Sequence, residues 1–389
     1  MIAFYIFLAV LILAISLYIP EMLIVFYFGR KRNADGETHK GVTRLPMVSI
    51  VLPVYNEESL IKPKMRNMLE LNYPKELLEI IVVDGNSRDR TANIVKEFCK
   101  DGVKLIEQKT REGVTEAVKK GVSVSKGDII VMSDAEALFD RDAIRLLVEN
   151  FEDPSVGGVS GRQVLINSTS NYVTRMEMAY GSFHERMRAA ESRMYSTSHF
   201  KGELVAVLRD LFPFDASSTV GALDHSIAFN VIRKGFRAIV DDRVVFKDRS
   251  PEYLKDRNMQ KVQRGTLLQE NVLQNRDMLF NPAFKTFGKF ILPSNFLVYI
   301  IFPVVFLADL ILAPFALFDL YLYSPVAVYL IVAGSAVLLL PKRIRVFASA
   351  FFHSQFMLLI GLKRIAIGGK PKYIKQVEGT RKIAARGTC

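Results

Sequence analysis

The sequence has 389 residues, 50% of them hydrophobic, and a formal net charge of +12 from 52 Lys and Arg against 40 Asp and Glu. This length exceeds that of an ordinary single domain, so we expect one folded domain with an additional module. The basic clusters lie beside apolar runs and are not interleaved with aromatic residues, which disfavours nucleic acid as a partner and favours anionic lipid headgroups.

The first 28 residues are apolar apart from Glu21, and Met1 is followed at once by hydrophobic side chains. A bilayer core of ~30 Å is crossed by about 20 apolar residues, so this run is long enough to span it. It ends at Gly29-Arg-Lys-Arg32 and not at a small-residue cleavage site, unlike a signal peptide. The sequence therefore predicts a retained transmembrane anchor at residues 1–29, followed by a linker at 30–46.

From Met47 onward, short β-branched runs alternate with helix-length amphipathic stretches. This alternation predicts an α/β domain with a mostly parallel sheet over residues 47–250. We expect strands at residues 48–53, 79–84, 103–106 and 128–133, and helices at 59–71, 89–98 and 113–124.

Polar clusters follow three of these strands: Tyr55-Asn-Glu57, Asp84-Gly-Asn-Ser87 and Asp134-Ala-Glu136. Ligands of open α/β sheets bind beyond the carboxyl ends of the strands, so the three clusters should converge. The sequence has no Gly-x-Gly-x-x-Gly or Walker A motif, which disfavours a Rossmann dehydrogenase or a P-loop NTPase.

Asp134 and Glu136 stand one residue apart just past a buried strand. Alternate side chains on an extended backbone point the same way, and hard divalent cations seek carboxylate oxygens. The pair therefore predicts a metal site, the alternative being a solvated acidic loop.

The second half of the chain returns to apolar sequence. We expect interfacial helices at residues 251–290 and two transmembrane helices at 291–341, separated by a break at 319–325. Residues 342–389 predict an interfacial or re-entrant helix and a basic cytoplasmic tail, because a complete crossing would put the tail's cations outside.

The basic clusters Arg30-Lys-Arg32 and Lys342-Arg-Ile-Arg345 flank the predicted spans on the side of the soluble domain. Positively charged loops prefer the cytoplasm, so we expect a multi-pass protein of the cell membrane with a cytoplasmic catalytic domain. Cys99 and Cys389 match no metal spacing and indicate a reducing compartment.

Three segments together resemble family-2 glycosyltransferases of the GT-A fold, which include ceramide glucosyltransferase-like and polysaccharide synthase-like membrane enzymes. The segments are Val51-Leu-Pro-Val-Tyr-Asn-Glu-Glu58, Ile81-Val-Val-Asp-Gly-Asn-Ser-Arg-Asp-Arg-Thr91 and Gly127-Asp-Ile-Ile-Val-Met-Ser-Asp-Ala-Glu136. The resemblance covers roughly residues 47–274. It implies a GT-A domain that uses a nucleotide-diphosphate sugar as donor, a UDP-sugar in preference to a GDP-sugar.

The resemblance also implies roles for individual residues. Pro53, Tyr55 and Glu57 would line the nucleotide pocket, Asp84 would contact the base or ribose, and Asp134 and Glu136 would occupy the family's Asp-x-Asp position at the diphosphate. The implied cofactor is Mg²⁺ or Mn²⁺, which neutralises the charge that develops on the leaving group. Glu136 departs from the family's second Asp but keeps the charge.

Asp224 lies where the family has its catalytic base, ahead of the run from Ser226 to Gly235. A hydroxyl acceptor needs such a base because it must lose a proton as it attacks. The alternative is that Asp224 caps a helix beginning near His225.

Arg264 matches the arginine of the Gln-x-x-Arg-Trp sequence found in membrane members of the family, whereas the Gln and Trp are absent here. A guanidinium pairs bidentately with phosphate oxygens, which predicts a substrate-binding role at the diphosphate. The alternative is a solvated helix charge.

These expectations combine into a metal-dependent membrane glycosyltransferase that moves a sugar, with inversion, to a hydroxyl of a lipid-carried or saccharide acceptor. Two enzymatic alternatives are a polyprenyl-phosphate sugar synthase, whose ionised acceptor needs no base, and a processive polysaccharide synthase. A third alternative, from another class, is an inactive membrane scaffold.

Overall fold

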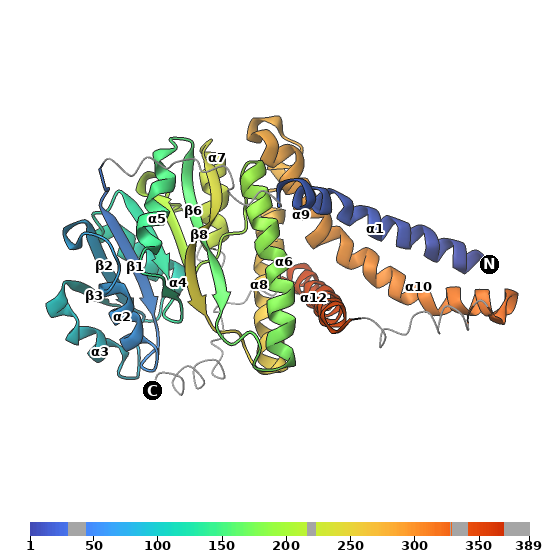
Figure 1. Cartoon of the computed structure of the whole chain (residues 1–389), viewed down its shortest axis with the longest axis horizontal. Helices are drawn as coiled ribbons and strands as arrows, with labels where there is room; N and C mark the ends of the chain where they lie inside the picture. Colours follow the sequence, from blue (N-terminus) through green and yellow to red (C-terminus); the bar gives the residue numbers. More distant parts are fainter. Residues whose placement is uncertain (30–43, 216–222, 327, 329–340, 369–389) are drawn as a thin grey trace.

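The computed structural model describes residues 1–29, 44–215, 223–326, 328 and 341–368. An α/β domain lies at one end of the molecule, and two long apolar helices project from the other end (Figure 1). Between these two parts stand α6 and α8, which run across the edge of the domain (Figure 1).

The domain is built on one eight-stranded sheet in the order β3-β2-β1-β4-β7-β6-β8-β5. The strands from β3 to β4 are parallel, β7 is antiparallel to both its neighbours, β6 and β8 are parallel, and β5 is antiparallel to β8. The bounds are β1 Val48–Val54, β2 Leu78–Asp84, β3 Val103–Glu107, β4 Ile129–Ser133, β5 Leu138–Phe139, β6 Val156–Leu165, β7 Leu204–Leu208 and β8 Arg237–Asp248. The predicted mostly parallel sheet is present.

Side chains of the buried strands alternate between two cores, as a strand period of two requires. Ile50 and Leu52 of β1 belong to one core and Val51 to the other. The first core is covered by α2 and α5, and the second by α4 and α7. These helices, with α3 at the sheet edge, span Ile61–Leu69 (α2), Thr91–Glu97 (α3), Val114–Val124 (α4), Ala143–Glu149 (α5) and Leu223–Arg233 (α7).

Gly121 allows α4 to approach the sheet closely. A Cβ atom built at this position would lie 2.4 Å from Cγ1 of Val51. A larger residue would therefore push α4 away from β1, and with it the loop that precedes α4 at the carboxyl edge of the sheet.

Two longer helices are α6 (Tyr172–Met194), which follows β6, and α8 (Leu254–Gln274), which follows β8. Asn171 starts α6 with a capping box, in which its side chain accepts from the Thr174 amide. A third helix, α12 (Lys342–Ala366), packs against both α6 and α8. Glycines at the contact between α12 and α8 allow the two helices to approach closely. A Cβ atom on Gly361 would lie 2.4 Å from Oε1 of Gln269.

The apolar helices are α1 (Ile2–Phe28) and α10 (Phe302–Tyr323), which run side by side and pack through Ala14, Leu17, Phe302 and Phe306. Helical turns η7 (Phe287–Ile291), α9 (Leu292–Phe296) and η8 (Leu297–Ile301) lead directly into α10. The remaining single turns are η1 Lys75–Leu77, η2 Cys99–Asp101, η3 Asn150–Glu152, η4 Arg209–Leu211, η5 Arg276–Met278 and η6 Pro282–Phe284.

Among the described residues, three helices are long and apolar enough to cross a membrane: Ile2–Phe28, Phe287–Tyr323 and Lys342–Ala366. The helix α10 ends at Tyr323. The second span expected within residues 291–341 falls on positions 327 and 329–340, which lie outside the described residues.

Candidate active site

A cavity of about 470 Å³ opens at the carboxyl edge of the sheet. Seven of the eight residues predicted for the site line it: Pro53, Tyr55, Glu57, Asp134, Glu136, Asp224 and Arg264. They come from segments up to about 200 residues apart in the chain, and the fold brings them to one space. Asp84 is the exception, since its neighbour Gly85 forms the cavity wall at that point.

Asp84 instead supports the loop that follows β2. It is 3% exposed, and its two carboxylate oxygens accept from the Ser87 amide at 2.9 Å and the Ser87 hydroxyl at 2.5 Å. The same hydroxyl accepts from the Asn56 amide at 2.9 Å, which ties the loop after β1 to the loop after β2. Asn56 and Asn86 both adopt positive φ, 54° and 64°, which asparagine tolerates better than most residues.

The part of the cavity beside the loop after β1 carries an aromatic platform. The guanidinium carbon of Arg111 lies 3.9 Å from the centre of the Tyr55 ring, and both residues line the cavity. Glu57 is held beside them because its amide donates to the Thr91 hydroxyl at 2.7 Å. A planar, partly charged surface of this kind suits a nucleobase or ribose.

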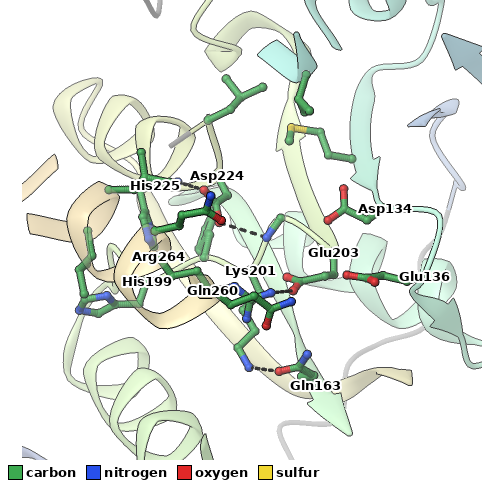
Figure 2. A pocket seen from close by; sticks show the side chains of 18 of the residues that line it. Asp134, Glu136, Gln163, His199, Lys201, Glu203, Asp224, His225, Gln260 and Arg264 are labelled. Carbon is green, nitrogen blue, oxygen red and sulfur yellow. Dashed lines mark hydrogen bonds and ion pairs between the residues drawn. The ribbon is translucent and has the colours of Figure 1, made fainter. Parts of the chain in front are cut away.

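The acidic segment after β4 has the alternation expected from the sequence. Asp134 and Glu136 are partly exposed to the cavity, whereas Ala135 and Ala137 are 6% and 0% exposed. Both carboxylates therefore face the same space, where Figure 2 also places Glu203.

Glu203 precedes β7 and was not predicted from the sequence. Its Oε1 accepts from Nη2 of Arg264 at 3.0 Å, an ion pair that joins the start of β7 to α8 (Figure 2). Glu203 is 6% exposed along its side chain and Arg264 is 54% exposed, so the guanidinium keeps a free approach from the cavity. The pair places a positive charge next to the acidic segment.

The site carries an excess of negative charge. Burial raises the pKa of Asp134 to about 7, with Glu203, Asp224 and Asp248 adding to the effect and Arg264 opposing it. Burial and Asp248 likewise raise the pKa of Glu136 well above its ordinary value. The pKa of Glu203 is lowered instead, because the positive charges of Arg264 and Lys201 outweigh the effect of burial. Neighbouring carboxylates that resist joint ionisation mark a place that a cation would stabilise.

The donor set fits a divalent ion only in part. No group of three or more His, Cys, Asp or Glu side chains within the described ranges could hold a metal by itself. Asp134 and Glu136 supply two carboxylates, and a Mg²⁺-type ion is often held by one or two carboxylates together with substrate phosphates. The residues present therefore suit an ion that binds together with a diphosphate.

Asp224 lies in the first turn of α7 and lines the cavity. Its two oxygens accept from the amides of Gly202, at 3.1 Å, and His225, at 2.9 Å (Figure 2). Burial is the main cause that raises its pKa above 3.8. The contact with Gly202 joins α7 to another part of the chain, so Asp224 does more than interact with its own helix.

The far wall of the cavity is made by helices that contain candidate membrane spans. Tyr299 belongs to η8, and Ser354, Met357 and Leu358 belong to α12. The cavity therefore reaches from the carboxyl edge of the sheet to the apolar part of the molecule.

Two histidines, His184 and His199, meet around Tyr299 in this wall. The His199 ring lies 5.3 Å from the Tyr299 ring, and the His184 ring stacks on Tyr299 at 6.3 Å. Burial is the main cause that lowers the pKa of His184 to about 3 and that of His199 well below 6.5, so both are neutral at pH 7. In the sequence, the four-residue spacing of Tyr180, His184 and Arg188 indicates that these three side chains share one face of a helix, which is α6 in the structure.

Comparison with known proteins identifies the first part of this architecture. Residues 49–212 match the model of the Glycosyl transferase family 2, which is less than half of the chain. The chain is similar to the probable glycosyltransferase YdaM of Bacillus subtilis (strain 168), at 36% identity over 38% of this chain and 37% of that protein. It is also 31% identical to a beta-monoglucosyldiacylglycerol synthase of Trichormus variabilis, over 39% of this chain and 33% of that protein.

A solved structure matches nearly the whole chain. It is the mannosyltransferase PcManGT from Pyrobaculum calidifontis, in complex with GDP-Man and Mn²⁺, with a TM-score of 0.73 and 26% identity over 93% of this chain and 98% of that one. The predicted family resemblance and the GT-A fold are thereby confirmed. The matched segments amount to about a third of the two curated relatives' own lengths.

Proposed function

We propose that this chain, whose residues 49–212 form a family 2 glycosyltransferase domain, transfers a sugar from a nucleotide-diphosphate sugar to an acceptor at the membrane surface. The observation that carries the proposal is that one and the same cavity is lined by Tyr55 and Glu57 of the α/β domain and by Tyr299 and Leu358 of the apolar helices. A donor bound by the domain and an acceptor held by the apolar helices would meet in that space.

The donor end supports binding of a nucleoside diphosphate. The Tyr55 and Arg111 platform would take the nucleoside, and Arg264 would pair with the diphosphate through its planar fork. The similar mannosyltransferase PcManGT is in complex with GDP-Man, so GDP-sugars are candidate donors together with the UDP-sugars that the sequence favoured.

Asp134 and Glu136 would hold a divalent ion against the diphosphate. A Mg²⁺ or Mn²⁺ ion bound there supplies positive charge that stabilises the nucleotide leaving group. Mn²⁺ accompanies the nucleotide sugar in the PcManGT structure, which supports a metal in this position and leaves Mg²⁺ open as the working ion.

Asp224 would serve as the base. Its carboxylate takes the proton of an acceptor hydroxyl as that oxygen attacks the anomeric carbon, while the bond to the diphosphate breaks and the nucleoside diphosphate leaves. Attack opposite the leaving group inverts the anomeric centre. A carboxylate with a pKa raised by burial is a better proton acceptor than an ordinary aspartate.

The acceptor would be lipid-carried or a saccharide held at the membrane, because α12 and η8 form the wall opposite the donor loops. A polyprenyl-phosphate sugar synthase is the second candidate, and it would leave Asp224 without a proton to remove. A processive polysaccharide synthase would be recognised by products longer than one added sugar, and an inactive scaffold by the lack of nucleotide release.

The topology we propose is a multi-pass protein of the cell membrane with its catalytic domain in the cytoplasm. In Figure 1, α12 is strongly foreshortened while α1 and α10 extend across the plane of the picture, so α12 runs across the direction that those two helices share. This arrangement supports an interfacial α12, with α1 and α10 crossing the bilayer.

The test is incubation of the purified full chain in nanodiscs with a panel of UDP- and GDP-sugars, a membrane lipid extract and either Mg²⁺ or Mn²⁺. We expect nucleotide release with one donor, dependent on both metal and extract. Release that requires no metal would remove the metal role, and no release with any donor would favour the scaffold.

A further inference from the structure

A buried lysine, Lys64, forms hydrogen bonds with the acidic segment that carries Asp134 and Glu136. The Nζ atom of Lys64, on α2, donates to the Ser133 hydroxyl at 2.7 Å and to the Ala137 carbonyl. These two groups lie immediately before and after the pair of predicted metal ligands. One ammonium therefore fixes both ends of the turn.

A second α2 side chain, Asn67, lies one turn later and holds Phe139 at both its amide and its carbonyl. Asn67 donates through Nδ2 to the Phe139 carbonyl at 2.8 Å, and its Oδ1 accepts from the Phe139 amide at 2.8 Å. The Lys64 ammonium also lies 3.9 Å from the centre of the Phe139 ring. Lys64 and Asn67 together form an α2 clamp that holds the chain from Ser133 to Phe139.

The clamp also reaches Glu203. The Ser133 hydroxyl that accepts from Lys64 donates to the Glu203 carbonyl at 3.2 Å. Two hydrogen bonds, through Ser133, thus connect Lys64 to the residue that pairs with Arg264.

Packing alone does not explain a lysine in this position. Lys64 is 0% exposed, and lysine is almost never fully buried unless it is paired. An apolar side chain of similar volume would fill the same space without the cost of desolvating a charge. Burial accordingly lowers the pKa of Lys64 to about 7, with Asp134 opposing the shift.

We infer that Lys64 is a positioning residue for the metal-diphosphate site, acting with Asn67 to hold Asp134 and Glu136 toward the cavity. The inference rests on the proposed function, because it assumes that these carboxylates hold a metal. It predicts that the clamp changes metal affinity, since groups that orient metal ligands typically cost ~10–100-fold in affinity when they are removed.

The experiment compares the full chain with Lys64→Met, which keeps the volume and removes the ammonium. Mn²⁺ affinity is measured by titration calorimetry in the presence of GDP and, separately, UDP. We expect Lys64→Met to bind Mn²⁺ ~10–100-fold more weakly. Raising Mn²⁺ should recover sugar transfer in this variant and not in Asp134→Asn. Mn²⁺ affinity equal to that of the wild type would overturn the inference.

Met68→Leu is the matched control, because Met68 is on the same helix and 0% exposed but packs in the apolar core. It should keep wild-type Mn²⁺ affinity. If Lys64→Met does not fold, Asn67→Leu replaces it in the same measurement. An Mn²⁺ affinity of Asn67→Leu equal to that of the wild type would then overturn the inference. If the wild type binds neither nucleotide with Mn²⁺, the proposed function itself is overturned. If the wild type binds Mn²⁺ with a nucleotide and the variant has the same Mn²⁺ affinity, only the inference about the α2 clamp is overturned.

Discussion

Arg264, on α8, and Glu203, just before β7, pair at 3.0 Å between Nη2 and Oε1, although they are separated by 61 residues. The pair positions the guanidinium before any substrate arrives. A planar guanidinium has five donors, so it can keep Glu203 and still reach a phosphate oxygen.

Arg264→Lys tests this double role. We expect kcat/KM to fall by about one to two orders of magnitude, because a lysine cannot serve both partners and hydrogen bonds to charged groups are worth ~1.5–3 kcal/mol. Steady-state kinetics with the active donor measure the effect. Arg276→Lys, at an exposed position of η5, is the control, and its kcat/KM should equal that of the wild type. A full-rate Arg264→Lys enzyme would make Arg264 a structural charge.

Asp134→Asn and Glu136→Gln test the metal ligands. Each removes one charge and little volume, so each should leave the thermal unfolding temperature near that of the wild type. Loss of metal-assisted charge stabilisation is worth several kcal/mol, which lowers turnover at least ~100-fold. Asp140→Asn, at the exposed ion pair with Lys247, is the control. Full activity of either site variant at low metal would remove that residue from the metal site.

Asp224→Asn separates binding from transfer. Positioned bases contribute ~10²–10⁴-fold, so we expect sugar transfer to fall by two or more orders of magnitude while donor affinity stays within about a few-fold. If donor affinity falls with the rate, Asp224 is a donor-site or structural residue. If neither changes, a phosphate acceptor becomes the better interpretation, since an ionised phosphate has no proton to lose.

Glu177 offers a test of stability against pH. Burial alone would raise its pKa, but Lys261 and Arg257, at 2.8 and 3.1 Å, outweigh burial and lower it to about 2. A depressed folded-state pKa means that the stabilisation is present above the ordinary value of 4.5 and is lost as pH falls toward 2.

We therefore expect Glu177→Gln to destabilise the protein by ~3–5 kcal/mol at pH 7, because the 1% exposed Arg257 loses its partner. The difference from wild type should narrow below about pH 4.5, as thermal unfolding in detergent at pH 7, 5 and 3.5 would reveal. A gap that stays constant over this range would contradict the assigned ion pair.

The sidedness of α12 can be tested with the two native thiols. Cys99 is exposed on the catalytic domain, and Cys389 follows the described residues. We expect a membrane-impermeant thiol reagent to label both from the same side of sealed vesicles, using Cys99→Ser and Cys389→Ser to separate the signals. Labelling from opposite faces would mean that α12 crosses the bilayer completely.

The parts of the site that the sequence predicted are those encoded locally. Tyr55, Glu57, Asp134 and Glu136 directly follow strands whose β-branched runs are visible in the chain, and parallel strands bring their carboxyl ends together. Asp224 and Arg264 were identified through the family resemblance, and the cavity brings both to the acidic segment.

The missed residues depend on contacts between distant segments. Glu203 gains its place through Arg264, and Lys64 looks like a solvated charge on an amphipathic helix until the segment from Ser133 to Phe139 covers it. His184 and His199 meet only around Tyr299, about 100 residues further along the chain. No local spacing records such meetings.

The close contact of Gly361 with Gln269 has a consequence for how the protein can be handled. Gln263 and Arg264, on the same helix as Gln269, line the cavity, so this wall of the cavity depends on the packing of α12 against α8. A truncated fragment ending after the family 2 match would retain Tyr55, Glu57, Asp134 and Glu136 and lose Asp224, Arg264 and the wall formed by η8 and α12. On the roles proposed for these residues, the minimal catalytic unit would include α8 and α12, and a water-soluble version would require redesign of all three apolar helices, Ile2–Phe28, Phe287–Tyr323 and Lys342–Ala366.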